Sequence, residues 1–217
     1  MAIKLHGQPW SNNTVRAMAV LNEKGLDHFA PGLDYELCPV DLRSGGHKRP
    51  EFLDLNPFGQ IPVFQDGDGS VFESRAITRY VATRYKETGT DLLSASSAAL
   101  ETWLQVEGSQ FNPPMFRIIF ELGIKPLIGM STNMSVVENE SDKIGTVLDV
   151  YEAHLAKNKY LAGDEFTLAD LNHMPEIYIL SKSAKFDLID SRPHLKAWWE
   201  DISARPAWEK TAVSLPF

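Results

Sequence analysis

Residues 56–62 read NPFGQIP and residues 73–77 read ESRAI, and these two stretches decide the fold of the chain. A proline pushes the residue before it out of the helical region, so the first stretch must run extended, with a turn at Gly59. The bond between Ile61 and Pro62 enters a short apolar run and is a candidate cis peptide bond. A cis bond would leave the Ile61 amide and carbonyl free to pair with another extended backbone. The alternative is an ordinary turn, because most X–Pro bonds are trans.

The second stretch has the pattern of a helix N-terminus. Ile77, Val81 and Tyr85 recur every four residues, which predicts a helix with Ser74 as its N-cap. The free amides of such a first turn bind carboxylates, and the neighbouring Glu73 can hold an ammonium group. An amino-acid headgroup carries both charges, so the two stretches together predict a site for a peptide-like ligand. The alternative is that Ser74 only caps its own helix while Glu73 interacts with the helix dipole.

Other ordered motifs run along nearly the whole chain. They are Lys4–Gly7 with Ser11, His47–Lys48, Gln65–Asp68, Leu161–Asp164, Phe166–Leu171, Arg192–His194, Ala197–Trp199 and Ala204–Trp208. With the two stretches above, this series resembles the cytosolic glutathione transferases, and most closely their plant phi class. The resemblance implies an α/β thioredoxin-like N-terminal domain over residues 1–88 and an all-α C-terminal domain over residues 97–217, which is the glutathione transferase fold.

The hydrophobic pattern predicts the same organisation. Strand-like runs at 3–6 and 35–40 flank a helical run at 11–24, and the order continues with a hairpin and the helix after Ser74. After a polar linker at 87–96 the strand signals disappear and amphipathic helical stretches take over. The sequence therefore predicts a domain boundary near residue 90.

Two local features concern folding. The segment Gly25–Asp27 recurs as Gly32–Asp34, so about seven residues, such as 25–31, form an apparent insertion that we expect to be a protruding loop. Residues 167–170 form a capping box variant, with Phe166 and Leu171 placed as a hydrophobic staple across it.

Composition excludes several classes of function. The formal charge of −8 and the lack of a Lys/Arg run argue against nucleic-acid binding. No stretch approaches the roughly 18 apolar residues of a membrane span, and the N-terminus lacks the apolar block of a signal peptide, so we expect a cytosolic protein without membrane contact. Cys38 is the only cysteine, which excludes an intrachain disulfide and a C-x-x-C redox pair. The 6 histidines are not spaced for a helical metal site, so no metal is expected.

The resemblance implies a glutathione transferase, with glutathione as cosubstrate and no tightly bound cofactor. A free thiol with a pKa of about 8.5 is mostly protonated at neutral pH, so the enzyme must stabilise the thiolate. Ser11 can donate a hydrogen bond to the sulfur from the start of the first helix. No G-x-S-x-G elbow surrounds Ser11, so we expect it to stabilise the nucleophile and not to attack. The alternative for Ser11 is a plain N-cap.

The remaining site residues are implied by the resemblance. His47 and Lys48 are expected near the glycyl carboxylate, although a solvated loop pair is the alternative. The other residues expected around glutathione are Asn12, Gln60, Ile61, Pro62, Glu73, Ser74 and Arg75. The hydrophobic electrophile is expected at Trp10, Asn12, Met115, Phe116, Ile119 and Phe120. The four-residue spacing within the last four is equally typical of a core stripe.

Three functions therefore stay open. They are a transferase acting on hydrophobic electrophiles in detoxification and stress responses, a non-catalytic carrier of hydrophobic metabolites, and a structural interaction domain such as the transferase-like part of a translation factor. Ser11 favours the first, and the same thiolate could reduce hydroperoxides. The family forms homodimers, and Phe58 is an exposed apolar candidate for the contact between subunits.

Overall fold

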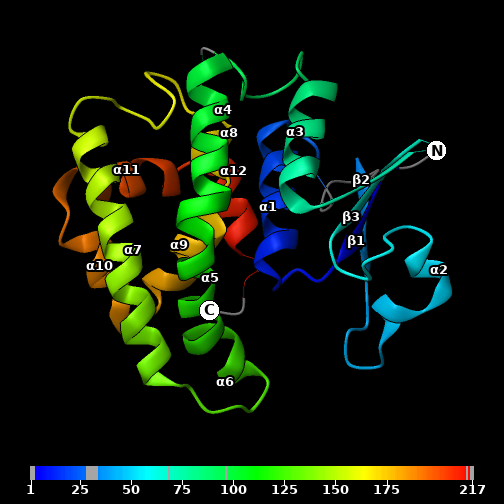
Figure 1. Ribbon diagram of the computed structural model, residues 1–217. Helices are drawn as coiled ribbons and strands as arrows, with labels where there is room; N and C mark the ends of the chain where they lie inside the picture. The colour runs from blue at the N-terminus through cyan, green and yellow to red at the C-terminus, as the bar shows by residue number, and fades with distance from the viewer. Residues whose placement is uncertain (1–2, 28–33, 68, 96, 214, 216–217) are drawn as a thin grey trace. The chain divides into compact units, whose positions relative to one another are not determined.

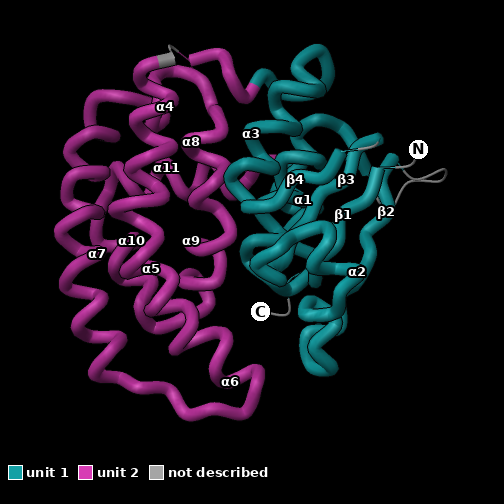
Figure 2. Tube along the Cα trace, turned by 45° about the vertical axis from the view of Figure 1, so that its right-hand side comes forward, with its two compact units in different colours: residues 1–91, 206–216 teal, residues 92–205, 217 magenta. Residues whose placement is uncertain are grey.

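The computed structural model describes residues 3–27, 34–67, 69–95, 97–213 and 215. The chain divides into two compact units, of which the first comprises Met1–Asp91 with Pro206–Pro216 and the second comprises Leu92–Arg205 (Figure 2). This division assigns the last helix, α12 (Pro206–Ala212), to the first unit, whereas the predicted range 97–217 placed it in the second. The physical reason is that α12 packs on α1 (Asn12–Glu23), where the Asn22 amide donates to the Thr211 hydroxyl at 2.8 Å.

The first unit is built on a four-stranded sheet with the order β2-β1-β3-β4; Figure 1 labels β1, β2 and β3, and Figure 2 labels all four strands. Its strands are β1 (Ile3–Gly7), β2 (Tyr35–Pro39), β3 (Val63–Asp66) and β4 (Gly69–Phe72). Strand β1 pairs parallel with β2 and antiparallel with β3, and β3 forms the predicted hairpin with β4. The predicted strands at 3–6 and 35–40 and the helical run at 11–24 are confirmed, with β1 one residue longer and β2 one residue shorter than expected.

Helices cover the sheet of the first unit. Helix α1 packs against α3 (Ser74–Arg84), and the side chains of Leu5 and Phe64 are fully buried. A second buried cluster contains Val40, Phe52 and Val63, and Phe52 comes from the short helix α2 (Pro50–Leu53). Helix α2 and the 3-10 turn η1 (Gly46–Lys48) occupy the segment that the sequence predicted as irregular.

The described elements of the second unit are helical, as predicted, apart from an isolated β-bridge between Tyr160 and Gly163. Its elements are α4 (Ser97–Val106), η2 (Glu107–Phe111), α5 (Asn112–Ile119), η3 (Phe120–Ile124), α6 (Lys125–Leu127), α7 (Met134–Leu155), α8 (Leu168–Leu171), α9 (Met174–Ser181), η4 (Ala184–Phe186), α10 (Asp187–Asp190) and α11 (Pro193–Ser203). The two segments η2 and η3 are π-helical. Each precedes proline, at 113–114 and at 126, and proline lacks the N–H that the carbonyl four residues earlier would bind, so the backbone widens there.

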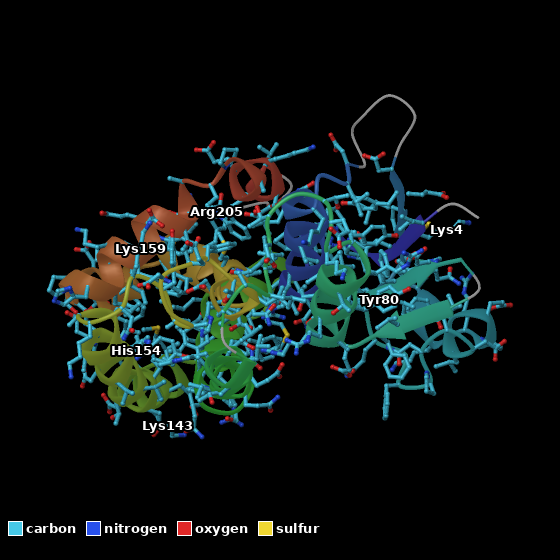
Figure 3. The ribbon with its side chains drawn as sticks, turned by 90° about the horizontal axis from the view of Figure 1, so that it is seen from above. Lys4, Tyr80, Lys143, His154, Lys159 and Arg205 are labelled. Carbon is cyan, nitrogen blue, oxygen red and sulfur yellow. The ribbon has the colours of Figure 1, made fainter. Side chains whose placement is uncertain are left out.

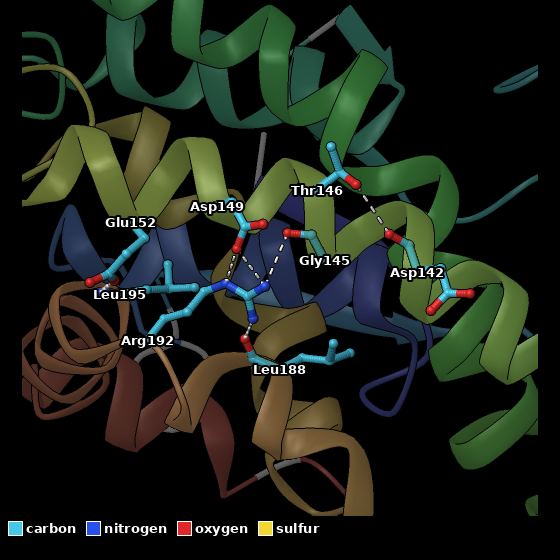
Figure 4. Close-up of polar contacts among 8 residues, drawn as sticks. All are labelled: Asp142, Gly145, Thr146, Asp149, Glu152, Leu188, Arg192 and Leu195. Atoms are coloured by element: carbon cyan, nitrogen blue, oxygen red, sulfur yellow. Dashed lines mark hydrogen bonds and ion pairs between the residues drawn. The ribbon is translucent and has the colours of Figure 1, made fainter.

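Polar contacts within the second unit hold the long helix α7 to the start of α11. Arg192 donates to the Asp149 carboxylate at 2.7 and 2.9 Å and to the Gly145 carbonyl at 3.1 Å (Figure 4). The carboxylate of Glu152 accepts from the Leu195 amide at 2.8 Å, which satisfies a free donor at the start of α11. Side chains 43 residues apart in sequence therefore fix α11 on α7.

Cationic side chains also lie on aromatic rings of the second unit. The Arg205 guanidinium is 3.9 Å from the ring centre of Phe166, and the Lys159 ammonium is 4.9 Å from that of Tyr160 (Figure 3). These cations therefore cover apolar surface of their own unit. Among the described residues, no helix has both the length and the apolarity needed to cross a membrane.

The capping box is confirmed. The Thr167 hydroxyl accepts from the Ala169 amide at 3.2 Å, and the Asp170 carboxylate accepts from the Thr167 amide at 2.9 Å. The staple residues Phe166 and Leu171 are both buried.

The predicted loop at 25–31 falls largely outside the described residues, since 28–33 are not described, and it stays a prediction. The described residues on either side of it are joined. The Asp34 amide donates to the Asp27 carbonyl at 3.0 Å, and the Asp27 amide donates to the Asp34 carboxylate at 3.0 Å. The repeated aspartates thus bring the two ends of this segment together.

Candidate functional site

The register of the sheet brings the predicted glutathione-site segments to one edge of the first unit. His6 lies opposite Val63, and Val63 lies opposite Phe72. At this end of the sheet, Pro62 directly precedes β3 and Glu73 directly follows β4. The start of α1, the extended segment 56–62 and the start of α3 therefore lie close together, although they are far apart in the sequence.

Ser11 occupies the N-cap position of α1 with an extended backbone, at φ −79° and ψ 122°. Its carbonyl accepts from the Val15 amide at 2.8 Å, but its hydroxyl makes no capping hydrogen bond. An N-cap serine normally uses its hydroxyl on the first-turn amides. The hydroxyl of Ser11 is therefore available to a ligand at the N-terminal end of α1.

The residues around Ser11 differ in exposure. Asn12, which was expected near both glutathione and the electrophile, is 4% exposed and has partners within the protein. Trp10 is 39% exposed, so its ring can contribute apolar contact area. Of these two expected electrophile contacts, only Trp10 presents a large surface.

The segment 56–62 is held by Asn56, which is 1% exposed. The Asn56 amide donates to the Gln60 carbonyl at 2.7 Å, and its side-chain oxygen accepts from the Phe58 amide at 3.1 Å. The Ile61–Pro62 bond is cis, as the candidate reading expected. Among the described residues, neither the amide nor the carbonyl of Ile61 has a hydrogen-bond partner, so an extended ligand backbone can pair with them. Asn56 was not among the expected site residues, although an asparagine just before a proline-bracketed turn signals such a clamp.

Lys48 binds the segment 56–62 from η1. Its ammonium donates to the carbonyls of Phe58 and Gly59, at 2.9 Å each. Lys48 is thus more than a solvated loop residue, because it satisfies two backbone carbonyls at the turn. The neighbouring His47 is half-buried, and its Nδ1 atom is buried without a hydrogen-bond partner among the described residues.

The start of α3 differs from the expectation in one respect. The expected N-cap was Ser74, but Glu73 takes that position and Ser74 is the first residue of the helix. The reason is the backbone of Glu73, which has a φ of 67° and cannot belong to the helix. Such a left-handed conformation costs about 1–3 kcal/mol for a residue with a Cβ and persists only where the surroundings enforce it.

Glu73 and Ser74 face different environments. The side chain of Glu73 is exposed and does not cap α3, so its carboxylate can bind a ligand ammonium. Ser74 is 5% exposed, and its hydroxyl interacts with α1. The next residue, Arg75, is half-buried and has partners within the protein.

Arg16 is a residue of this region that sequence reasoning missed. It is 0% exposed, and its Nη1 atom donates to the Asn13 side chain at 2.7 Å and to the Ser74 hydroxyl at 2.9 Å. The available signal was its position as a single charge inside the apolar run 15–21. A buried charge is rare unless it has partners, which makes such a residue worth notice.

The four expected electrophile contacts of the second unit divide into two pairs. Met115 and Ile119 are 0% exposed, and Ile119 also lines a cavity of only about 40 Å³. Their burial agrees with a core stripe. Phe116 is 37% exposed and lies next to the half-buried Phe120, with 6.2 Å between ring centres. The second pair is the one that can present apolar surface to a ligand.

Two further features of the first unit lie apart from the expected site. Cys38 is half-buried, and burial, followed by the charge of Glu36, raises the pKa of its thiol. Cys38 is therefore protonated at neutral pH and is a poor nucleophile. A cavity of about 490 Å³ lies beside α2, and none of the expected site residues lines it. Its walls include His6, Val40 and Phe52.

Comparisons with known protein families agree with this architecture. The family description "Glutathione S-transferase, N-terminal domain" matches residues 1–83, and "Glutathione S-transferase, C-terminal domain" matches residues 111–206. The chain is 52% identical over 218 residues to glutathione S-transferase 3 of Zea mays, covering 99% of this chain and 95% of that protein. It is 48% identical over 213 residues to glutathione S-transferase PARB of Nicotiana tabacum, covering 97% of each chain.

Solved structures show the same similarity. Glutathione transferase F7 from Populus trichocarpa superposes with a TM-score of 0.92 at 45% identity, covering 100% of both chains. The structure of glutathione S-transferase III in its apo form superposes with a TM-score of 0.91 at 53% identity, covering 100% of this chain and 98% of the other.

Proposed function

Because the chain belongs to the glutathione S-transferase family, in its plant phi class, and is a glutathione S-transferase, we propose that Ser11 holds the thiol of glutathione as a thiolate for attack on hydrophobic electrophiles. The observation that carries this proposal is the Ser11 hydroxyl, which stands at the N-cap of α1 without capping it. A hydroxyl donor and the positive end of a helix dipole both favour a sulfur anion over a neutral thiol.

The reaction follows from that placement. The thiolate attacks the electrophilic carbon, a sulfur–carbon bond forms, and the bond from that carbon to its leaving group breaks. The proton of the thiol is released before the attack, so the enzyme gains rate by lowering the thiol pKa and by holding the sulfur in place. Ser11 stabilises the nucleophile and forms no covalent bond itself.

The rest of the glutathione molecule follows the edge of the first unit in this proposal. The unpaired amide and carbonyl of Ile61 pair with the cysteinyl backbone. The γ-glutamyl end lies at the start of α3, where Glu73 binds the ammonium and the backbone amides that begin with Ser74 bind the carboxylate. His47 and Lys48 lie toward the glycyl carboxylate.

Supporting residues complete the proposed site. Gln60 and Pro62 shape the segment that carries Ile61. Asn12 supports the start of α1, and Arg75 supports the start of α3. We propose Trp10 of the first unit, and Phe116 and Phe120 of the second, as contacts of the electrophile. Met115 and Ile119 are proposed as buried apolar residues of the second unit that support the two phenylalanines. An apolar surface of this kind favours hydrophobic electrophiles in detoxification and stress responses, and the same thiolate can reduce hydroperoxides.

The test is Ser11→Ala. We expect the variant to bind glutathione with nearly unchanged affinity, to raise the pKa of the bound thiol, and to lower kcat by about 10²-fold or more, as loss of a charge-stabilising donor does. Ultraviolet titration of bound thiolate and turnover with an aryl halide measure these effects. Ser70→Ala, which alters an exposed serine on β4, is the control and should behave as wild type. Equal turnover in Ser11→Ala and wild type would exclude the role of Ser11.

We propose further that the protein forms a homodimer through Phe58. The ring of Phe58 is 64% exposed and has an edge contact with Phe72, with 6.1 Å between ring centres. So large an exposed aromatic side chain on a polar turn is typical of an interface. Phe58→Ser should shift the mass in analytical ultracentrifugation from dimer to monomer, and a wild-type mass that stays monomeric at all concentrations would refute the dimer.

A further inference from the structure

We propose that Arg16 is a positioning residue of the glutathione site, whose buried guanidinium clamps Ser74 to α1 and so orients the pocket for the γ-glutamyl carboxylate. The inference rests on the proposed function and deepens it. Arg16 lies behind the ligand surface and acts through Ser74, so it is not a catalytic residue.

The geometry of the clamp is a closed triangle of three side chains. Arg16 Nη1 donates to Asn13 Oδ1 at 2.7 Å and to Ser74 Oγ at 2.9 Å, and Ser74 Oγ donates to Asn13 Oδ1 at 3.3 Å. Arg16 and Asn13 belong to α1, whereas Ser74 is 58 residues away from Arg16 and begins α3. The triangle therefore fixes the first residue of α3 on the first turns of α1.

The position of Ser74 in the chain gives the clamp its importance. Ser74 directly follows Glu73, whose φ of 67° is unfavourable for a residue with a side chain. Contacts that fix the next residue help to enforce such a conformation. Glu73 keeps an exposed carboxylate, and the fixed Ser74 side chain holds the first backbone amides of α3 in place, so this helix start is set for an amino-acid headgroup.

Arginine suits this task better than lysine. Its planar guanidinium offers several donors in a fixed arrangement, so one group can bind two acceptors on different helices without losing much conformational freedom. A buried charge is weak evidence for stability, because apolar residues of similar volume often serve the fold as well. Its complete burial with partners on two helices points instead to fixing their relative position.

Ser11 does not depend on the clamp. The Ser11 amide donates to the Gln8 carbonyl at 3.0 Å, and the Ser11 carbonyl accepts from the Val15 amide at 2.8 Å, so the backbone places it. Loss of Arg16 should therefore weaken glutathione binding at Ser74 and spare the chemical step at Ser11. This predicts a change in KM and Kd for glutathione without a matching change in kcat.

The experiment compares Arg16→Met, Arg16→Lys and Asn13→Ala in the full-length protein. In Arg16→Met we expect Kd by calorimetry and KM for glutathione to rise about tenfold (~1.4 kcal/mol), with kcat at saturation within about threefold of wild type. Arg16→Lys, which keeps the charge but has donors on a single nitrogen, should restore part of the affinity. Asn13→Ala removes the shared acceptor at a half-buried position and should raise Kd by about threefold.

Lys24→Met is the matched control. Lys24 is 2% exposed, follows the C-terminal end of the same helix, and donates to the Thr90 carbonyl at 2.6 Å. Its loss removes a buried cation far along the helix from Ser74. We expect it to lower Tm and to leave Kd and KM for glutathione unchanged.

The outcomes separate the two proposals. If the wild-type protein binds and turns over glutathione, a folded Arg16→Met variant with unchanged Kd overturns the role of Arg16. A Lys24→Met variant that loses as much affinity as Arg16→Met also overturns it. If Arg16→Met does not fold, Asn13→Ala decides: a raised Kd supports the clamp and an unchanged Kd overturns it. A wild-type protein that neither binds nor turns over glutathione refutes the proposed function itself.

Discussion

Removing the side chain of Asp170 should destabilise the protein markedly. Its carboxyl is fully buried and accepts hydrogen bonds from the amides of Leu161 and Thr167 and from the Trp198 indole, each at 2.9 Å. The Thr167 hydroxyl adds a fourth donor at 3.3 Å. Asp170→Ala would leave all of these donors buried without an acceptor.

The magnitude follows from the donors and from the pKa. An unsatisfied buried N–H costs about 1–3 kcal/mol, so the three N–H groups together cost about 6 kcal/mol. Burial raises the pKa of Asp170 from 3.8 to about 6 despite the hydrogen bonds, which means that ionising Asp170 costs about 3 kcal/mol more in the folded than in the unfolded protein. The variant no longer bears this cost at neutral pH. We therefore expect Asp170→Ala to lose about 3 kcal/mol at pH 7.

The pH dependence has a defined sign. Because the folded pKa lies above the unfolded one, the folded protein binds the extra proton between about pH 4 and pH 6. The stabilisation from protonated Asp170 is fully present below about pH 4 and is lost as pH rises through about pH 6. Asp170→Asn cannot ionise, so its stability should lack this decline.

Urea denaturation followed by tryptophan fluorescence, repeated between about pH 4 and pH 7, measures both effects. Asp190→Asn is the control, because Asp190 is an exposed carboxylate paired with Lys196 at 2.6 Å. It should change the free energy of unfolding by less than about 1 kcal/mol. A loss below about 1 kcal/mol in Asp170→Ala, or equal pH slopes in Asp170→Asn and wild type, would refute the reasoning.

Three further predictions concern positions that the structure singles out. Gly59→Ala should lose about 2–4 kcal/mol of stability and weaken glutathione binding, because φ is +57° and the added Cβ would lie 2.6 Å from the His47 carbonyl oxygen; an unchanged Tm would contradict this. Asn56→Ala should cost about 1–2 kcal/mol in urea denaturation, since it removes the part-buried hydrogen bonds to the Gln60 carbonyl and the Phe58 amide. Arg192→Gln should cost about 1–2 kcal/mol through loss of the paired bonds to Asp149, and a double-mutant cycle with Asp149→Ala that shows no coupling would count against it.

The placement of the helix starts shows why some expectations held and others did not. The capping box at 167–170 is confirmed, because its partners lie within one turn and their spacing is visible in the sequence. The expected N-cap at Ser74 was wrong by one residue, because the backbone of Glu73 takes a left-handed conformation that no local pattern indicates. Local hydrogen bonds can be inferred from residue types, but a strained φ is enforced from outside the segment.

Side-chain roles that depend on distant partners were also missed. In the sequence, Arg16 is a single charge in an apolar helical run. Its role becomes visible only in the structure, where Ser74, 58 residues later, lies within hydrogen-bond distance. The spacing of Met115, Phe116, Ile119 and Phe120 left a core stripe and a ligand surface equally open. Burial separates them into a fully buried pair and a partly exposed pair, which remain proposals as ligand contacts.

From sequence alone came the two-part α/β and all-α architecture, the family, the turn at 56–62, and the helix that begins beside Glu73. The cis bond at Ile61–Pro62 was a candidate in the sequence and was decided by the structure. These depend on periodicity, proline chemistry and capping, which act over a few residues. Only the tertiary structure decided that α12 returns to the first unit, that the hydroxyl of Ser11 does not cap its own helix, and that Arg16 joins α1 to α3. Those outcomes arise from packing and hydrogen bonds between residues far apart in the chain. No single segment contains both partners of such a contact, so its free energy cannot be inferred from one segment.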